Sequence, residues 1–474
     1  QERLWFIDAL QPGQNVYHIP ITLRLTGSPD ANLIQQCLSE IIIRHEILRT
    51  SFVSKDGIPQ QEIVPELSLP PLVREDDPRE LYQKPFQLHE PPLLRAQLVP
   101  DSPESAILHL VVHHIIADYW SLRILLRELQ HLYAARQGGK PSPLPELRIQ
   151  YLDYAVWQNQ QRDEHQRELS YWSQQLAGVP PLLRLPSDFQ RPAQPTFQGA
   201  RHRIQLDASS SDALTALARE ENVTSFSAML ALFEGLLFRY TEQDDFCIGS
   251  TISNRDREET RNLIGLFVNN IVFRCQPQES WSLREWIRNT HQTVIEGLRH
   301  QQVPFERVVD TLKIDRQLNH NPLFQVQFLL RPAEEAGSQT QEGFQIQTIE
   351  PEHATSRFDL SLELTETANG FKGFFEYSSE LFQPGTIARL GEHLALLLNV
   401  ATKAPDQRLS DHALLTPSES EQLDTWNKTE QKLPSSCAHE LISQQATLTP
   451  DSPAISFKAK TLSYQELESR SNQL

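Results

Sequence analysis

The feature that most constrains the fold is an apolar stretch at residues 106–118 that carries two adjacent histidines and an aspartate. Ile and Val dominate residues 106–116, and such a run predicts a strand buried on both faces. His113, His114 and Asp118 interrupt its apolar character. Burying imidazole and carboxylate groups is costly unless they are paired or used in chemistry. The stretch therefore predicts either a satisfied internal hydrogen-bond cluster or an active site.

The two histidines are expected to have different surroundings. Side chains alternate along a strand, so His113 and His114 should point to opposite faces. This argues against a zinc site, which would need both imidazoles to converge with further ligands. The sequence has no cysteine cluster and no HExxH motif to supply such ligands. We expect one histidine to bond to backbone inside the protein and the other to face a cleft, where an imidazole can move or orient a proton.

A helix is predicted directly after Asp118. Ser121 stands at the position expected for its N-cap, and Asp118 lies in the turn between strand and helix. A carboxylate in a dry turn favours a cationic partner. Apolar residues then recur at helical spacing: Leu122, Leu125, Leu126, Leu129, Leu132 and Tyr133.

The run HHIIADY at 113–119 resembles the HHxxxDG signature of the condensation domains of nonribosomal peptide synthetases, a branch of the chloramphenicol acetyltransferase-like acyltransferases. Further stretches resemble the other motifs of that family, in the same order. Together they cover most of residues 1 to 400, although each could also be plain helix or strand packing. These stretches are QERLW at 1–5, RHEILRTSF at 44–52, YLDYAVW at 151–157, IGLFVNN at 264–270, HQQVPFE at 300–306 and NPLFQVQF at 321–328.

The resemblance implies an α/β (α+β) fold of two chloramphenicol acetyltransferase-like lobes, a V-shaped pseudo-dimer with the active-site tunnel between the lobes. We expect an N-lobe at residues 1–177 and a C-lobe at 178–410. The proline-rich segment 179–196 reads as an extended crossover between them, and residues 332–343 read as an exposed loop.

The end of the chain carries a second resemblance. Residues 411–435 are polar and are expected to form a linker. Residues 436–474 resemble the opening of an adenylation domain, as a truncated start that ends before that family's phosphate-binding loop. A condensation domain followed directly by an adenylation domain is the arrangement of an elongation module.

The implied activity is amide (peptide) bond formation between a donor acyl or peptidyl thioester and the amine of an acceptor aminoacyl thioester. Both substrates would be carried on the phosphopantetheine arms of carrier domains, so this chain is expected to bind no cofactor or metal of its own. The family places the second histidine, His114, at the reaction centre, as a base or as a group that orients the amine. His113 would support it. Asp118, the third residue of the catalytic motif, would act structurally by pairing with Arg255.

One position departs from the family signature. Tyr119 stands where the family usually has glycine, and Trp120 and Ser121 follow it. We expect these three residues to line the substrate tunnel, because a tyrosine needs volume and a partner for its hydroxyl. The departure leaves open a variant domain that acts on a modified donor, either a dehydrating one or one that takes a polyketide-type acyl group.

Three rival functions remain to be weighed. An epimerisation domain shares the histidine motif, but the sequence has no match to that family's glutamate motif. A heterocyclisation domain would have aspartate in place of His113. A catalytically silent module that only docks carrier or tailoring proteins usually has a degraded histidine motif, whereas His113, His114 and Asp118 are all present.

Composition excludes two other classes of function. The 43 Lys and Arg residues against 61 Asp and Glu residues give a net charge of −18 without a basic stripe, which disfavours nucleic acid as a partner. No apolar run approaches the ~20 residues of a membrane-spanning helix.

The four cysteines are scattered, which favours a reducing, cytoplasmic location over a disulfide framework. Without a signal peptide or initiator Met, the chain reads as part of a longer protein.

Overall fold

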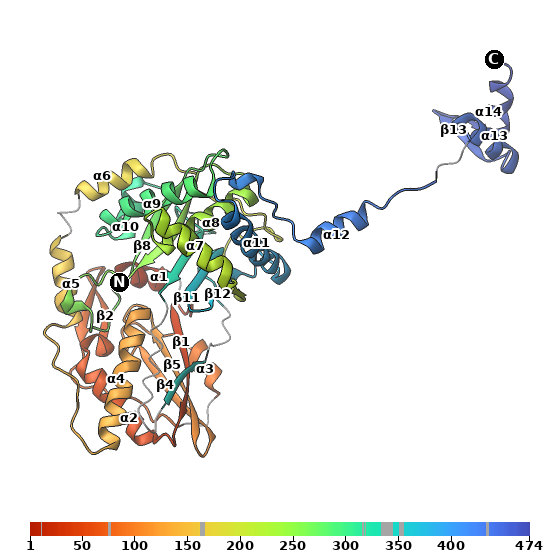
Figure 1. The fold of residues 1–474 in the computed structure, drawn as a ribbon. Coiled ribbons are helices and arrows are strands. Elements are labelled where there is room, and N and C mark those ends of the chain that lie inside the picture. Colours follow the sequence, from red (N-terminus) through yellow and green to blue (C-terminus); the bar gives the residue numbers. More distant parts are fainter. Residues whose placement is uncertain are drawn as a thin grey trace. The chain divides into compact units, whose positions relative to one another are not determined.

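The computed structural model describes residues 1–10, 12–73, 77–161, 166–314, 317, 319–332, 345–349, 355–432 and 436–474. The chain divides into two compact units, residues 1–414 and 415–474, and the first contains both lobes (Figure 1). The predicted exposed loop at 332–343 lies almost entirely outside the described residues. No described helix is long and apolar enough to cross a membrane.

The N-lobe is built on a four-stranded sheet of order β10-β1-β5-β4, in which every neighbouring pair is antiparallel. Helices α2 and α4 pack against each other and share one core with this sheet (Figure 1). The apolar stripe of α2 recurs at helical spacing and is the part of that helix that is buried. The elements of this part of the chain are α1 (Glu2–Leu10), β1 (His18–Thr26), α2 (Ala31–Arg44), β2 (Thr50–Lys55), β3 (Ile58–Ile63), α3 (Pro78–Gln83), β4 (Leu94–Ser102), β5 (Ser105–His113), α4 (Tyr119–Gln137), α5 (Tyr151–Gln160) and α6 (Gln166–Gln175).

The C-lobe is built on a six-stranded mixed sheet of order β6-β12-β11-β9-β7-β8. Strand β9 runs parallel to both β7 and β11, and the other pairs are antiparallel. Helix α8 is buried on all sides through its middle turns, as its apolar sequence predicts. The elements of this part of the chain, of which β10 joins the N-lobe sheet, are β6 (Gly199–Gln205), α7 (Ala208–Glu220), α8 (Ser225–Thr241), β7 (Phe246–Ile252), β8 (Asn269–Cys275), α9 (Leu283–Arg299), α10 (Phe305–Leu312), β9 (Val326–Arg331), β10 (Gln345–Ile349), β11 (Leu360–Thr367), β12 (Gly370–Ser378) and α11 (Pro384–Lys403).

Segments of the chain cross between the lobes at several points. Residues 179–196 contain no helix or strand. Leu183 and the buried residues of α6 before this segment pack in the C-lobe core, so the prediction that 179–196 crosses between the lobes is wrong. Strand β10 follows β9 in sequence but pairs with β1 in the sheet of the N-lobe, from Thr22 opposite Ile349 to Thr26 opposite Gln345. Helix α6 was placed in the N-lobe by the predicted boundary at residue 177, yet its buried residues belong to the core of the C-lobe. The lobes are therefore interlocked.

The second unit is built around a β-hairpin. The hairpin consists of β13 (Pro453–Phe457) and β14 (Lys460–Ser463). It packs with α14 (Tyr464–Ser471), which in turn packs with α13 (Ala438–Leu448). The segment predicted as a linker contains a helix, α12 (Pro417–Trp426), which has no buried residue. Its Thr416 N-cap and Glu419 form a capping box, a local signal that explains the helix without tertiary packing.

Glu234 on α8 is a carboxyl group enclosed in the core of the C-lobe. It is 3% exposed, and its carboxyl accepts a hydrogen bond from the Thr290 hydroxyl. Burial raises the pKa of Glu234 to about 7, against the opposing effect of its hydrogen bonds with Thr290 and Cys275. The side chain is therefore held largely in its protonated form below neutral pH.

We predict that Glu234 makes the folded chain less stable as pH rises. The unfolded carboxyl has a pKa near 4.3, so the folded chain binds this proton more tightly, and about 3 kcal/mol of stability should be lost between that value and neutral pH. Equilibrium urea unfolding of the parent and of Glu234→Gln at several pH values measures the loss. The parent's stability relative to the variant should fall up to about pH 7 and then level off. A difference that does not change with pH would contradict the prediction.

Candidate active site

The two histidines of the motif lie in different local structures. Strand β5 ends at His113, and His114 begins the turn that leads to α4, so the predicted strand end at residue 116 is slightly too late. The backbone N–H of His114 donates to the carbonyl of Tyr17 at 2.8 Å, which ends the ladder between β5 and β1. The two histidines therefore lie in different local structures, and the predicted alternation along a strand does not apply to His114.

His113 is enclosed and neutral. It is 3% exposed, its Nδ1 accepts a hydrogen bond from the backbone N–H of Ile115 at 3.1 Å, and its ring packs edge-on against Phe86 and His18. Burial, followed by the nearby His18, lowers the pKa of His113 to about 3. This is the histidine that bonds to backbone inside the protein.

His114 is only half-buried, and one of its ring nitrogens is committed. Its Nδ1 lies 2.9 Å from the carbonyl oxygen of Ala117. A carbonyl oxygen can only accept, so we assign the proton to Nδ1. Burial first, and the positive charge of Arg357 second, lower the pKa of His114 to about 4. The ring is therefore neutral at pH 7, and its Nε2 carries an available lone pair.

Asp118 joins the turn, the helix and the C-lobe. It is fully buried and is the N-cap of α4, with Oδ1 accepting from the backbone N–H of Ser121 at 2.8 Å. The prediction of Ser121 as the N-cap is therefore wrong, because the N-cap is Asp118, one helical turn earlier. Asp118 Oδ2 accepts from the backbone N–H of Phe267 at 3.0 Å, and Oδ1 lies 3.1 Å from Nη2 of Arg255. The expected pairing of Asp118 with Arg255 is present.

Arg255 connects the C-lobe segment 255–267 to Asp118. We call the hydrogen-bonded cluster of Asp118, Ser121 and Arg255 the hub. Its Nη1 donates to the carbonyls of Thr260 at 2.6 Å and Leu263 at 2.7 Å, and its guanidinium lies 4.0 Å from the centre of the Phe267 ring. Burial lowers the pKa of Arg255, while Asp118 opposes that effect. Leu263, Ile264 and Phe267 then pack in the core of the N-lobe. The ion pair thus fixes a contact between the lobes.

Ser121 is part of this hub and does not line a tunnel, so that expectation is corrected. The residue is fully buried, and its hydroxyl oxygen lies 2.7 Å from Asp118 Oδ1 and 2.8 Å from the carbonyl of Gly265. It also accepts from Arg255 Nη2 at 2.9 Å. Glycine is required at 265 because a Cβ there would lie 1.9 Å from the ring of Tyr151.

Tyr119 and Trp120, the other two residues expected in the tunnel, are exposed. Tyr119 is the first residue of α4 and is 44% exposed, and its ring faces the guanidinium of Arg331. Trp120 is 40% exposed and donates from Nε1 to the carbonyl of Arg261 at 3.0 Å. Both side chains therefore meet the C-lobe beside the motif.

Several supporting residues are not identifiable from the sequence alone. Gln1 donates from its amide to the carbonyl of Ile115 at 2.7 Å, which fixes the turn after His114. His45, in the motif at 44–52, contacts Glu128 at 2.9 Å and accepts from the backbone N–H of Ile264 at 3.4 Å. Arg357 acts on His114 through its charge. For Gln1, His45 and Ile264, the one signal in the sequence is that each lies in a stretch that resembles a motif of the family.

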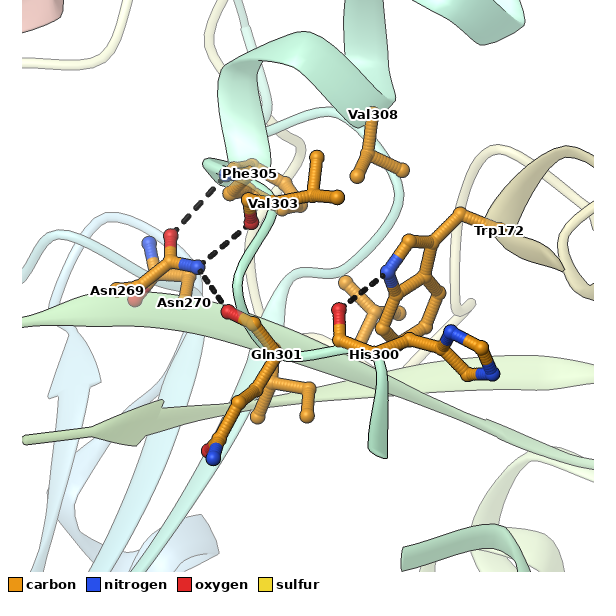
Figure 2. A pocket seen from close by; sticks show the side chains of 10 residues that line it. Trp172, Asn269, Asn270, His300, Gln301, Val303, Phe305 and Val308 are labelled. Atoms are coloured by element: carbon orange, nitrogen blue, oxygen red, sulfur yellow. Dashed lines mark hydrogen bonds between the residues drawn. The ribbon is translucent and has the colours of Figure 1, made fainter. Parts of the chain in front are cut away.

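A small pocket away from His114 shows how two other motifs are joined. Figure 2 shows the Asn269 side chain pointing at the loop before α10. It donates to the carbonyls of Gln301 at 3.1 Å and Val303 at 2.7 Å and accepts from the backbone N–H of Phe305 at 3.1 Å. On the opposite side, Trp172 donates to the carbonyl of His300. These hydrogen bonds join the segments that line the pocket, so we interpret this pocket as structural.

We predict strong thermodynamic coupling between Asp118 and Arg255. Asp118→Ala should destabilise the fold by about 3–5 kcal/mol, because it strands a buried guanidinium, and Asp118→Ala combined with Arg255→Met should cost less than the sum of the single changes. Urea unfolding at pH 7 measures the cycle. Glu62→Ala is a matched control that breaks an exposed pair with Lys55 and should cost less than about 1 kcal/mol. Additive single changes at Asp118 and Arg255 would contradict the coupling.

Comparisons with known proteins agree with this architecture. A family model described as "Condensation domain" matches residues 1–424. A linear gramicidin synthase of Brevibacillus parabrevis is 37% identical over 496 aligned residues, which cover 100% of this chain and 10% of that protein. The chain thus spans about a tenth of the length of this relative.

Solved structures share the fold. The X-domain from teicoplanin biosynthesis superposes with a TM-score of 0.81 at 26% identity, covering 87% of this chain and 96% of the X-domain. A further structure is the complex of that X-domain with OxyB, with a TM-score of 0.79. The four-domain nonribosomal peptide synthetase AB3403 matches 98% of this chain and 37% of its own with a TM-score of 0.84, and at 21% identity it speaks for the fold alone. The chain belongs to the condensation-domain family of nonribosomal peptide synthetases.

Proposed function

We propose that this chain forms an amide bond between a donor acyl or peptidyl thioester and the amine of an acceptor aminoacyl thioester, with His114 at the reaction centre. The observation that carries the proposal is the geometry of the His114 ring, which is half-buried in the turn after β5 with its Nδ1 bound to the Ala117 carbonyl. Burial also lowers the pKa of His114, which favours the neutral ring. Nε2 can therefore accept a hydrogen bond from the attacking amine.

The reaction balances without an external reagent. The neutral amine attacks the thioester carbonyl carbon, the C–N bond forms and the C–S bond breaks. The donor acyl group thereby passes to the amine, and the phosphopantetheine thiol of the donor carrier leaves. His114 Nε2 accepts or orients the proton that the amine loses, and that proton goes on to the leaving sulfur or to solvent. A low pKa makes His114 a weak base, so its larger contribution is to hold the amine in line with the carbonyl.

The other motif residues act by positioning. His113 anchors the end of β5 through the backbone N–H of Ile115. Asp118 and Arg255 hold the turn that carries His114 against the C-lobe segment, and neither reaches the reacting atoms because both are buried. Their substitution should affect the reaction through the geometry of the turn.

The partners follow from the chemistry. We propose an upstream donor carrier domain and a downstream acceptor carrier domain, each presenting its substrate on phosphopantetheine, and no cofactor bound by this chain. Two tethered reactants that meet in one site gain much of their rate from proximity. A reducing, cytoplasmic location is supported by the four free cysteines.

We further propose that residues 436–474 are the start of an adenylation domain, preceded by a linker at 411–435. The match to the linear gramicidin synthase extends over the whole of this chain, including this tail. The arrangement would make the chain part of an elongation module, in which the adenylation domain selects the acceptor.

A docking function is the second candidate. It is favoured by the likeness to an X-domain whose structure is known in complex with OxyB. The available Nε2 of His114 is what argues for catalysis instead. A variant reaction on a modified donor, either a dehydrating one or one that takes a polyketide-type acyl group, is a further candidate. Its basis is that Tyr119 stands where the family usually has glycine.

We predict that His114→Ala lowers the rate of carrier-bound product formation by about 10²-fold or more. Donor and acceptor carrier domains would be loaded, mixed with the parent or variant, and read by intact mass. His131→Ala, a half-buried histidine on α4, is the matched control and should retain the parental rate. Product made at the parental rate by the His114 variant would contradict the proposal.

The same mass measurement separates the alternatives. A product lighter by one water, formed by the parent and lost with His114→Ala, would identify the dehydrating variant. A folded parent that binds carrier or tailoring proteins but makes no product with any donor would favour the docking module.

A further inference from the structure

The first turn of α1 connects the turn between β5 and α4 to the C-lobe. The side-chain amide of Gln1 donates to the carbonyl of Ile115 at 2.7 Å. Two residues further on, Nη1 of Arg3 lies 3.0 Å from Oε1 of Glu306, the second residue of α10. The backbone N–H of Trp5 donates to the carbonyl of Gln1, so Gln1 and Arg3 belong to one helical turn.

The backbone of Ile115 is held by side chains on both sides of its peptide plane. Its N–H donates to Nδ1 of His113 at 3.1 Å, and its carbonyl accepts from the Gln1 amide. Gln61 on β3 in turn donates to Oε1 of Gln1 at 2.6 Å, which holds that amide in one orientation. Because His114 directly precedes Ile115, its ring moves when this part of the turn moves. The Gln1 amide therefore helps to set the direction in which the His114 ring points.

Arg3 is held at the start of α10 by two contacts. Besides the ion pair with Glu306, its guanidinium carbon lies 5.9 Å from the centre of the Phe305 ring. Phe305 is buried in the core of the C-lobe, and its backbone N–H donates to Asn269 on β8. On the N-lobe side, Trp5 of α1 packs against the core of that lobe. Helix α1 thus joins the core of one lobe to the core of the other.

The turn that carries His114 is therefore connected to the C-lobe at both of its ends. The hub joins the far end to segment 255–267, and α1 joins the near end to α10. The two connections meet again in the C-lobe, because Asn269 follows that segment and accepts from the first residue of α10. A displacement of the C-lobe reaches the turn from both sides, and small displacements of a positioned group change a rate strongly.

We propose that Arg3 is a positioning residue for His114, which transmits the position of α10 through Gln1 to the turn that carries the ring. The inference rests on the proposed condensation activity and adds a residue that acts on it without reaching the reacting atoms. Arg3 and Glu306 are 32% and 40% exposed. An ion pair of this kind, supported by a contact with an aromatic ring, is strong enough to change a rate several-fold.

The first test measures kcat and KM for carrier-bound product with the full chain. Arg3→Met keeps the length of the side chain and removes its charge. It should lower kcat about five-fold, equivalent to about 1 kcal/mol, and keep KM within about two-fold, because the turn orients the amine and does not set substrate affinity. Glu306→Gln should act alike. Exchange of the two charges, Arg3→Glu with Glu306→Arg, should restore part of the rate.

A matched control is available on the far side of the N-lobe. Arg136 at the end of α4 pairs with Glu40 on α2, and the two side chains are 35% and 25% exposed. This ion pair also joins two elements but does not contact the turn. Arg136→Met should therefore keep the parental kcat, whereas Arg3→Met should not.

A double-mutant cycle tests whether Arg3 acts through Gln1. Gln1→Met removes both hydrogen bonds of the amide and should itself lower kcat. In that background, Arg3→Met should have little further effect, because the connection to the turn is already broken.

The His114 ring can also be observed without turnover. In long-range ¹H–¹⁵N spectra of the chain labelled with ¹⁵N-histidine, Arg3→Met should move the His114 signals and leave those of His131 in place. A parent that makes no product would defeat the condensation activity and leave this positioning testable. The proposal is overturned if Arg3→Met keeps the parental kcat, if its effect persists in full beside Gln1→Met, or if the His114 signals do not move.

Discussion

The buried ion pair between Asp118 and Arg255 is the interaction on which the rest of the site depends. Two charges this far from water are costly, and each is held by further hydrogen bonds besides the ion pair. Asp118 accepts from the backbone of Ser121 and Phe267, and Arg255 donates to the carbonyls of Thr260 and Leu263. One carboxylate thereby starts α4, ends the turn after β5 and holds a segment of the C-lobe in the core of the N-lobe.

The different surroundings of His113 and His114 follow from the position of the turn between β5 and α4. Because the strand ends at His113, this ring stays in the enclosed side of the sheet and bonds to the Ile115 backbone. His114 falls in the turn, where its ring bonds back to Ala117 and is half-buried. The same few residues thus supply one structural imidazole and one that can face a substrate. Burial and the charge of Arg357 keep the second ring neutral.

The sequence predicts those parts of the fold that local pattern determines. The strand predicted at 106–116 is β5 (Ser105–His113), and the helix predicted after Asp118 is α4 (Tyr119–Gln137), because periodicity reports burial directly. The start of α4 was misjudged because Ser121 and Asp118 are both good N-caps, and only the three-dimensional position of the carboxylate decides between them.

Contacts between segments that are distant in the sequence are not predicted by local pattern. The pairing of Asp118 with Arg255 was expected only through the family resemblance, since nothing local selects Arg255 among the charged residues around it. Strand β10 in the sheet of the N-lobe, the charge of Arg357 near His114 and the contact of Tyr119 with Arg331 had no signal in the sequence. Each depends on how the two lobes interlock, which no single segment encodes.

The central claim is that His114 is a neutral ring with its proton on Nδ1 and a lone pair on Nε2 at working pH. Long-range ¹H–¹⁵N correlation spectra of the chain labelled with ¹⁵N-histidine test it most directly, with the His114→Ala variant to identify the signal. Since burial lowers the pKa of His114 to about 4, its nitrogens should keep the neutral Nδ1–H pattern from about pH 8 down to about pH 5 and titrate only below that. A proton on Nε2 at neutral pH, or a titration midpoint near the ordinary histidine value of about 6.5, would contradict the account.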